Sequence, residues 1–111
     1  MAMLRFSLLL FLAAPVLAQP IEQAVGNWKI FHGTGQPIFV QVIPSGTARY
    51  RGGKGIPGSW KLVEGRLELK WNDGWRDVIV RRGSTYRKLG YGPKHQGQGP
   101  PDHETAAFRR P

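Results

Sequence analysis

The alternation of charged and apolar positions is strongest between Gly58 and Arg82. Residues 66–71 read Arg-Leu-Glu-Leu-Lys-Trp, the period-two pattern of a strand with one buried and one solvated face. Asn72-Asp73-Gly74 follows, and its Asp-Gly pair favours a two-residue turn with positive φ at both central positions. The pattern therefore predicts a hairpin that joins residues 66–71 to the apolar run at 78–80.

The length of the hairpin loop sets which residues face each other. A two-residue loop at Asp73 and Gly74 buries the apolar residues on one face and pairs opposite charges on the other. The cross-strand pairs are then Leu69 with Val78, Leu67 with Val80, and Lys70 with Asp77. A three-residue loop would instead place Asp77 opposite Leu69, and a shift of one residue exchanges the two faces of a strand. We therefore predict the two-residue loop.

Further strand patterns lie on both sides of this hairpin. The strand before it covers residues 58–63 and is joined through Glu64-Gly65. The other expected strands are residues 25–31, 36–43, 47–51 and 84–91. No segment shows a 3.6-residue apolar period, so little or no helix is expected apart from a signal peptide. The predicted fold is all-β, a small antiparallel meander that curls into a barrel or half-barrel. Its predicted core is Trp28, Trp60, Leu67, Leu69, Trp71, Val78 and Val80.

The two ends of the chain differ in composition from this middle part. Arg5 is followed by an apolar run at 6–14 and by Pro-Val-Leu-Ala, which is the pattern of a signal peptide cut after Ala18. An uncleaved membrane anchor is the alternative. Residues 19–91 then form the β-meander domain. Residues 92–111 are rich in glycine, proline and histidine and are expected to be a flexible tail. The alternative is that Thr105 to Arg109 docks as a last short strand.

The cysteine content indicates how the chain is stabilised, and the net charge indicates which class of partner it binds. The chain has 111 residues, no cysteine and a formal net charge of +9, so packing rather than disulfides must stabilise it and anionic partners are favoured. For an exported protein, in the periplasm or outside the cell, these are lipid headgroups, anionic polysaccharide or an acidic protein. No specific nucleic acid is expected. The alternative is that the basic charge only keeps the protein soluble.

The Gly-x-Trp motif at Gly26 and Trp28, on the first strand of a small exported meander, resembles the opening motif of the calycins. This class includes lipocalins, avidin-like proteins and small bacterial metalloprotease inhibitors. The resemblance implies a calycin-like barrel in which the first-strand tryptophan closes one end beneath a basic side chain from a late strand. Arg87 or Arg109 is the candidate for that basic residue.

The candidate binding site is a basic surface that carries aromatic side chains. Aromatic platforms beside cations suit sugars, bases and lipid headgroups. The alternative is that long basic side chains cover an ordinary sheet and blunt its edges. The candidate ligand-binding residues are Arg49, Arg51, Lys54, Trp75, Arg76 and Tyr91, with Trp75 and Tyr91 as the exposed aromatics.

The sequence gives little evidence for catalysis or for metal binding. Cysteine is absent, the serines occupy turns, and each acidic residue has a structural role, with Asp77 as the partner of Lys70. His95, Asp102, His103 and Glu104 match no established metal-ligand spacing. Gly52-Gly53-Lys54-Gly55 has no following helix to make it a phosphate loop. We therefore expect no enzyme activity, no metal and no cofactor.

The resulting hypothesis is a non-enzymatic exported binding protein. Its basic, aromatic-bearing sheet face or loop rim would bind an anionic envelope polymer or lipid. The alternative is a protein-interaction module, such as an inhibitor of an exported enzyme, whose flexible end or Gly-Gly-Lys-Gly-Ile-Pro-Gly loop at 52–58 enters its target.

Overall fold

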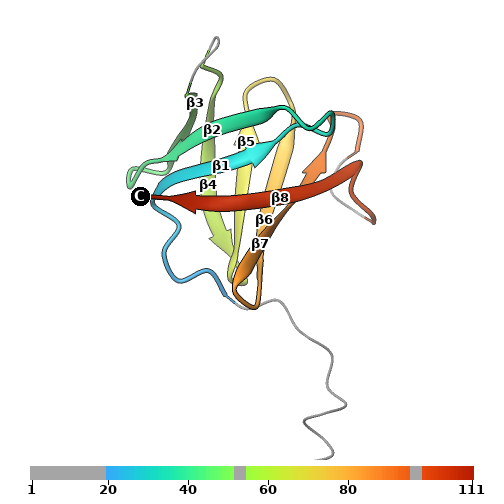
Figure 1. Cartoon of the computed structure of the whole chain (residues 1–111). Coiled ribbons are helices and arrows are strands. Elements are labelled where there is room, and N and C mark those ends of the chain that lie inside the picture. Colours follow the sequence, from blue (N-terminus) through green and yellow to red (C-terminus); the bar gives the residue numbers. More distant parts are fainter. Residues whose placement is uncertain (1–19, 52–54, 96–98) are drawn as a thin grey trace, which may run out of the picture.

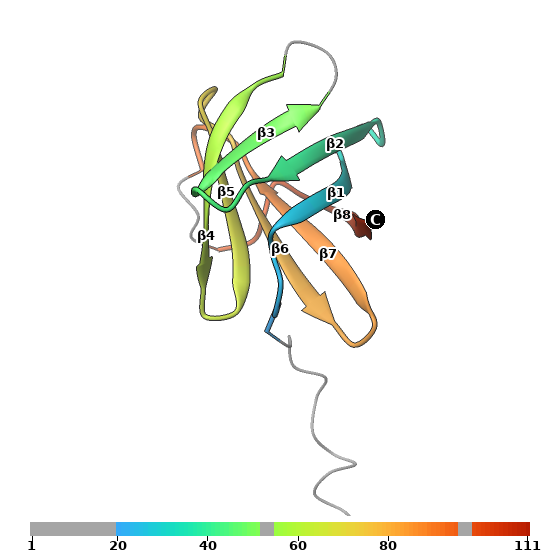
Figure 2. The same ribbon diagram turned by 90° about the vertical axis from the view of Figure 1, so that its left-hand side faces the viewer.

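The protein folds into a closed barrel of eight antiparallel strands (Figures 1 and 2). The computed structural model describes residues 20–51, 55–95 and 99–111, so the predicted signal peptide and Lys54 lie outside the described residues. Each strand pairs with the next, and the last pairs with the first. The strands are β1 (Gly26–Phe31), β2 (Pro37–Val42), β3 (Thr47–Arg51), β4 (Pro57–Val63), β5 (Arg66–Trp71), β6 (Arg76–Arg82), β7 (Thr85–Tyr91) and β8 (His103–Arg110). The all-β prediction is confirmed, and the barrel closes.

Three hairpins have the same type of turn. Gly33-Thr34-Gly35, Pro44-Ser45-Gly46 and Asn72-Asp73-Gly74 each connect two strands, and the last residue of each turn has a positive φ of 94°, 98° and 97° respectively. In each case the residue before the turn accepts a backbone hydrogen bond from that glycine. This geometry is the three-residue hairpin loop, in which only the final position needs the left-handed conformation that glycine adopts freely.

The β5–β6 hairpin therefore has a different register from the predicted one. Leu69 lies opposite Asp77 and Lys70 lies opposite Arg76, so the two-residue loop is wrong. The physical reason lies in the turn. Only Gly74 takes a positive φ there, while the Asp73 side chain accepts a hydrogen bond from the Trp75 amide at 3.1 Å. The extra loop residue moves Asp77 into the barrel and Val78 to the outside.

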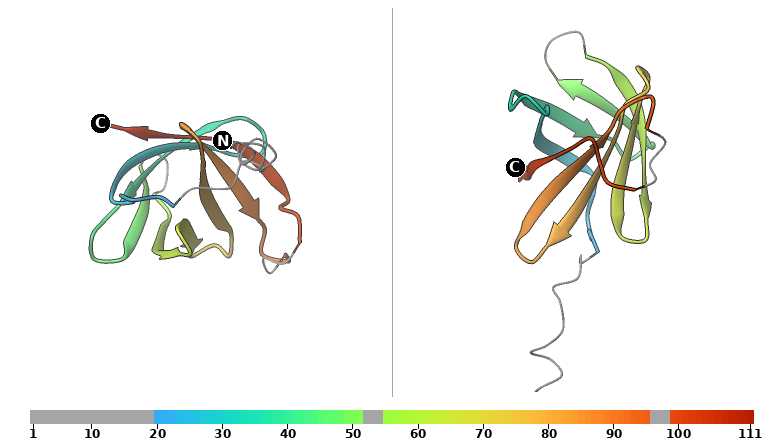
Figure 3. Two further views of the ribbon diagram at one scale, coloured as in Figure 1. Left: turned by 90° about the horizontal axis from the view of Figure 1, so that it is seen from below. Right: turned by 90° about the vertical axis from the view of Figure 1, so that its right-hand side faces the viewer.

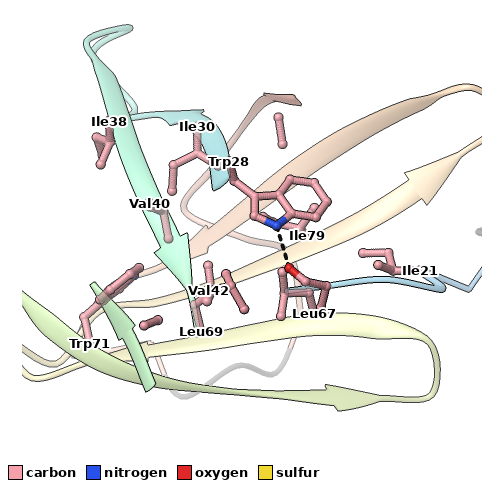
Figure 4. Packing of buried hydrophobic residues seen from close by; sticks show 13 residues of the cluster. Ile21, Trp28, Ile30, Ile38, Val40, Val42, Leu67, Leu69, Trp71 and Ile79 are labelled. Carbon is pink, nitrogen blue, oxygen red and sulfur yellow. Dashed lines mark hydrogen bonds between the residues drawn. The ribbon is translucent and has the colours of Figure 1, made fainter. Parts of the chain in front are cut away.

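A single apolar core fills the barrel (Figure 4). Trp28, Leu67, Leu69 and Trp71 are buried inside it, as predicted. Trp71 stacks on Tyr50 with ring centroids 4.3 Å apart. Val78 and Val80 are also buried, but they belong to a second cluster on the outer face with Tyr91, which corrects their predicted place in the interior. The core also includes Ile30, Ile38, Val40, Val42 and Ile79, with the half-buried Trp60 packed against it.

One end of the barrel is sealed around Trp28. Its indole donates to the Ala24 carbonyl at 2.9 Å (Figure 4), and the Arg109 guanidinium lies 5.1 Å from its ring centroid. Arg109 also donates to the backbone carbonyls of Gln23 and Val25. Ile21 closes the same end and donates its amide to the Gly65 carbonyl at 2.8 Å. Of the two basic residues that the sequence offered, Arg109 covers this tryptophan.

The last strand corrects the prediction of a flexible tail. His103–Arg110 forms β8, which pairs with β7 on one side and with β1 on the other (Figure 3). The segment is poor in large apolar residues, and Ala107 is its buried hydrophobic residue. It is ordered because β1 and β7 would otherwise present edges of unpaired backbone groups. The alternative of a docked strand at Thr105 to Arg109 is the correct one.

Candidate functional site

Cations and aromatic rings alternate on the outer surface of β1, β2, β3 and β8. Phe39 lies opposite Lys29, and Lys29 lies opposite Phe108, so one row crosses three strands. Phe39 is 37% exposed and Phe108 is 51% exposed. We call this surface the outer basic face and define it by Lys29, Phe31, Phe39, Arg49, Phe108 and Arg110.

Close contacts order the outer basic face. The Arg110 guanidinium lies 4.8 Å from the Phe39 ring centroid, and Lys29 Nζ lies 5.4 Å from the Phe31 ring centroid. Phe31 and Phe108 meet edge to face at 6.2 Å. Arg110 and Phe39 also border a hollow of about 360 Å³. The face therefore offers charged groups held against aromatic surfaces that stay open to solvent.

Glu104 pairs with basic residues that lie outside the outer basic face. It is the acidic residue of β8, and it lies toward the other end of the strand. There its carboxylate is 3.0 Å from Arg87 Nε and 3.7 Å from an Arg82 nitrogen. Its charge is therefore directed to the cations of β6 and β7.

The predicted binding residues divide among three places. Arg49 is exposed on the outer basic face, and Arg51 ends β3 opposite Phe39. Arg76 lies 4.6 Å over the ring of Tyr91 on another part of the barrel. Tyr91 is buried there, so its prediction as an exposed aromatic is wrong. Trp75 is half-buried and packs against the core.

The inner wall of the barrel carries a buried ion pair that the sequence analysis missed. Lys88 Nζ lies 3.5 Å from Asp77 Oδ1, and the two residues are 2% and 3% exposed. Asp77 Oδ2 also accepts the Trp71 indole proton at 2.8 Å. Lys88 donates to the Phe31 carbonyl. Burial lowers the pKa of Lys88, while the Asp77 carboxylate partly opposes that shift.

This pair corrects the predicted contact between Asp77 and Lys70. Asp77 faces inward because the three-residue loop shifts β6 by one position. Lys88 shares the parity of Tyr86 on β7, and the Tyr86 ring packs against the core. That parity was the available signal for Lys88, whereas Asp77 could be placed only after the loop length was known.

A pocket of about 360 Å³ opens at the end of the barrel opposite Trp28. We call it the barrel mouth. Its apolar walls come from β2, β3 and the loops around them, and the Asp77–Lys88 pair lies at its base. Burial raises the pKa of the Tyr50 phenol, so Tyr50 stays protonated there. The residues that line it are His32, Gly33, Thr34, Ile38, Tyr50, Ile56, Asp73, Trp75, Asp77, Lys88 and His103.

His103 is held in the wall of the barrel mouth by two glycines. A Cβ at Gly90 would lie 2.3 Å from His103 Nε2, and one at Gly33 would lie 3.0 Å from Nδ1, so neither position accepts a side chain without displacing the ring. The ring also meets Trp75 with centroids 5.8 Å apart. Its Nε2 is buried without a hydrogen-bond partner among the described residues. Burial, followed by the charge of Lys88, lowers the pKa of His103.

The other polar residues of this segment have structural partners. Asp102 accepts the Gly92 amide proton at 2.6 Å, which holds the pKa of its carboxyl below the ordinary value, and it lies 3.3 Å from His95 Nδ1. In the part of the chain that the structure describes, no three histidine, aspartate or glutamate residues gather as metal ligands. The described residues also include no helix long and apolar enough to cross a membrane.

Comparison with protein-family models, with curated proteins and with solved structures finds no match for this chain. The barrel topology is compatible with a calycin-like barrel. The functional argument therefore rests on the geometry of the outer basic face and of the barrel mouth.

Proposed function

We propose that this protein is an exported, non-enzymatic binding protein that holds an anionic polymer or lipid of the cell envelope on its outer basic face. The observation that carries the proposal is the row across β2, β1 and β8 in which Lys29 lies between Phe39 and Phe108. Exposed phenylalanine side chains add little to folding stability. Beside cations, however, they match a ligand with both charged and apolar parts.

Electrostatics supports the same partner. The chain carries 16 basic and 7 acidic residues, so a polyanion is attracted from a distance and then held by direct contacts. Sugars and acyl or headgroup carbons can pack on Phe39 and Phe108 while Arg49 and Arg110 bind phosphate or carboxylate groups. The Trp28 and Arg109 arrangement at the sealed end supports a calycin-like assignment, a class in which binding proteins are common.

A pair of matched charge reversals tests the proposal. Arg49→Glu with Arg110→Glu removes two cations of the outer basic face. Lys61→Glu with Lys70→Glu changes the net charge equally on the exposed surface of β4 and β5, as the control. Binding to heparin, to lipopolysaccharide and to vesicles of anionic phospholipid is measured by titration at several salt concentrations.

We expect the first variant to lose most of its affinity and to show a flatter dependence of log affinity on log salt, because fewer counterions are released. The control variant should lose much less. Both should melt close to the wild-type temperature, since exposed charges contribute little to stability. Equal losses in the two variants would show a net-charge effect without a site, and the proposal would fail.

The alternative function is an inhibitor or interaction module for an exported protein. Binding through an inserted loop depends on packing, so its affinity would change little with salt. A partner from an envelope extract that stays bound at high salt, and that the Arg49 and Arg110 variant still captures, would favour this alternative. Export itself is tested by the intact mass of the protein in the periplasm or medium, which should begin at Gln19.

A further inference from the structure

We propose that the anionic ligand of the outer basic face is a linear acidic polysaccharide, and that the side-chain amides of Asn27 and Gln41 recognise its sugar hydroxyl groups. This inference rests on the proposed function, because it concerns the same surface and names the class of its ligand. It follows from a second row of side chains that runs beside the row of Phe39, Lys29 and Phe108.

The second row crosses four strands. Asn27 on β1 lies opposite Arg110 on β8 and opposite Gln41 on β2. Gln41 in turn lies opposite Arg49 on β3. We call these four residues the amide row. Val40, which precedes Gln41, is buried in the core, so the alternation along the strand places this row on the outer surface. Neighbouring strands are about 4.8 Å apart, so the row is about 14 Å long.

The amides of the row are available to a ligand. The Gln41 side chain is half-buried and has no hydrogen-bond partner among the described residues. Asn27 lines the hollow of about 360 Å³ that Phe39 and Arg110 border, and its Oδ1 is covered, so its amide nitrogen is the polar atom left for a ligand. An amide carries N–H donors and a carbonyl acceptor, and a hydroxyl group can accept from the first and donate to the second.

The distribution of charge along the row favours the same ligand. Arg49 and Arg110 stand at its two ends, and two uncharged amides occupy the middle. An acidic polysaccharide carries carboxylates for the arginines and hydroxyl groups for the amides. A polyphosphate chain carries a charge on every unit and accepts hydrogen bonds without donating them. It would therefore leave the carbonyl of the Gln41 amide without a donor.

The aromatic rings of the face suit sugar units better than acyl chains. Lys29 lies between Phe39 and Phe108, so the two exposed rings do not join into one apolar surface. An acyl chain gains affinity in proportion to the apolar area that it covers, whereas a sugar ring can pack on a single aromatic side chain. The Arg110 guanidinium lies 4.8 Å from the Phe39 ring centroid, where it can pair with the carboxylate of a sugar packed on that ring.

One uncharged substitution tests the inference. Gln41→Met keeps the length of the side chain and the net charge but removes the amide. Gln36→Met is the matched control, because Gln36 is exposed, precedes β2 and lies outside the amide row. The probes are polygalacturonate, polyphosphate, which has no hydroxyl groups along its chain, and vesicles of phosphatidate in phosphatidylcholine. Dissociation constants are measured by titration at several salt concentrations.

We expect Gln41→Met to weaken the binding of polygalacturonate about three- to ten-fold, as the loss of one net hydrogen bond predicts. Binding of polyphosphate and of vesicles should be unchanged, and so should the slope of log affinity against log salt, because no cation is lost. Asn27→Leu should act in the same direction, and Gln36→Met should change none of the three affinities. On the unaltered protein, polygalacturonate should stay bound at a salt concentration that releases polyphosphate, since salt screens charges and not hydrogen bonds to hydroxyl groups.

The inference is overturned if Gln41→Met binds polygalacturonate as the wild type does, if it loses affinity equally for all three probes, or if the unaltered protein prefers the vesicles. The comparison of probes on the unaltered protein decides alone if the variant does not fold. The Arg49 and Arg110 variant separates this inference from the proposed function. If that variant loses affinity for every probe while Gln41→Met loses none, the proposed function holds and the polysaccharide assignment fails. If it loses no more than the Lys61 and Lys70 control, both fail.

Discussion

Lys88 and Asp77 form an ion pair inside the barrel, with Nζ and Oδ1 3.5 Å apart on two adjacent strands. The pair lies between the apolar core and the barrel mouth, and the Trp71 indole N–H donates a hydrogen bond to the carboxylate. A small barrel has few places where two charges can be removed from water. We therefore expect this pair to influence both the stability and the binding properties of the protein.

Breaking the pair should be much more costly than replacing it. Lys88→Met leaves a buried carboxylate without its cation, and the free energy of unfolding should fall by about 3 to 5 kcal/mol. Asp77→Asn should cost a similar amount, because the ammonium is then buried alone. The double variant should recover most of the loss, since no unpaired charge remains. Urea unfolding measures all three, and a double variant as unstable as the sum of the two single variants would contradict this account.

The stability of the protein should fall as the pH drops below 6.5. Burial holds the pKa of His103 below its ordinary value of 6.5, so the unfolded chain takes up a proton before the folded chain does. The free energy of unfolding therefore decreases with falling pH between 6.5 and the lower folded pKa. The groups that act on His103 are Lys88 and His32, which lower its pKa, and Asp77 and Asp102, which raise it.

His103→Phe should remove this part of the pH dependence. Thermal melting between pH 7 and pH 4 compares the two proteins. The contribution of Asp102 can be separated from that of His103. The pKa of Asp102 is held below 3.8, so the stability that it contributes is lost only at more acid pH. If the variant lost stability as steeply as the wild type below pH 6.5, another group would be responsible.

Arg109 should hold the N-terminal segment against the sealed end. Arg109→Met keeps an apolar stem over Trp28 but removes the donors to the Gln23 and Val25 carbonyls. Hydrogen bonds from charged groups contribute about 1.5 to 3 kcal/mol, and the partial exposure of this side chain places the expected loss at the lower end. Amide exchange of Ile21, which bonds to Gly65, should accelerate. Arg87→Met, on the outer face of β7, is the matched control and should leave that amide unaffected.

Short-range sequence patterns were sufficient to predict most of the strands and much of the core. Strict alternation in residues 66–71 identified Leu67, Leu69 and Trp71 as inward residues, and they are buried. Glu64-Gly65 is a two-residue turn as expected, with positive φ at both positions. These features depend on neighbours in the chain, because side-chain parity and turn chemistry are local properties.

The β5–β6 register could not be read from the hydrophobic pattern. Val78, Ile79 and Val80 are all apolar, so either register buries aliphatic side chains, and the expected pairing of Asp77 with Lys70 favoured the wrong one. The three turns that end in glycine were a better signal, since Gly35, Gly46 and Gly74 close loops of the same length. The cost of placing Asp77 inside is offset by Lys88, a partner from another strand.

The outer basic face and the barrel mouth depend on barrel closure. Residues 103–110 lack the apolar content that would predict a strand, yet β8 is paired on both sides because it satisfies the edges of β1 and β7. Closure brings Arg110 beside Phe39, Arg109 over Trp28, and His103 over Gly90. Local sequence determines which face of each strand is apolar, but backbone pairing between residues far apart in the chain determines which side chains meet.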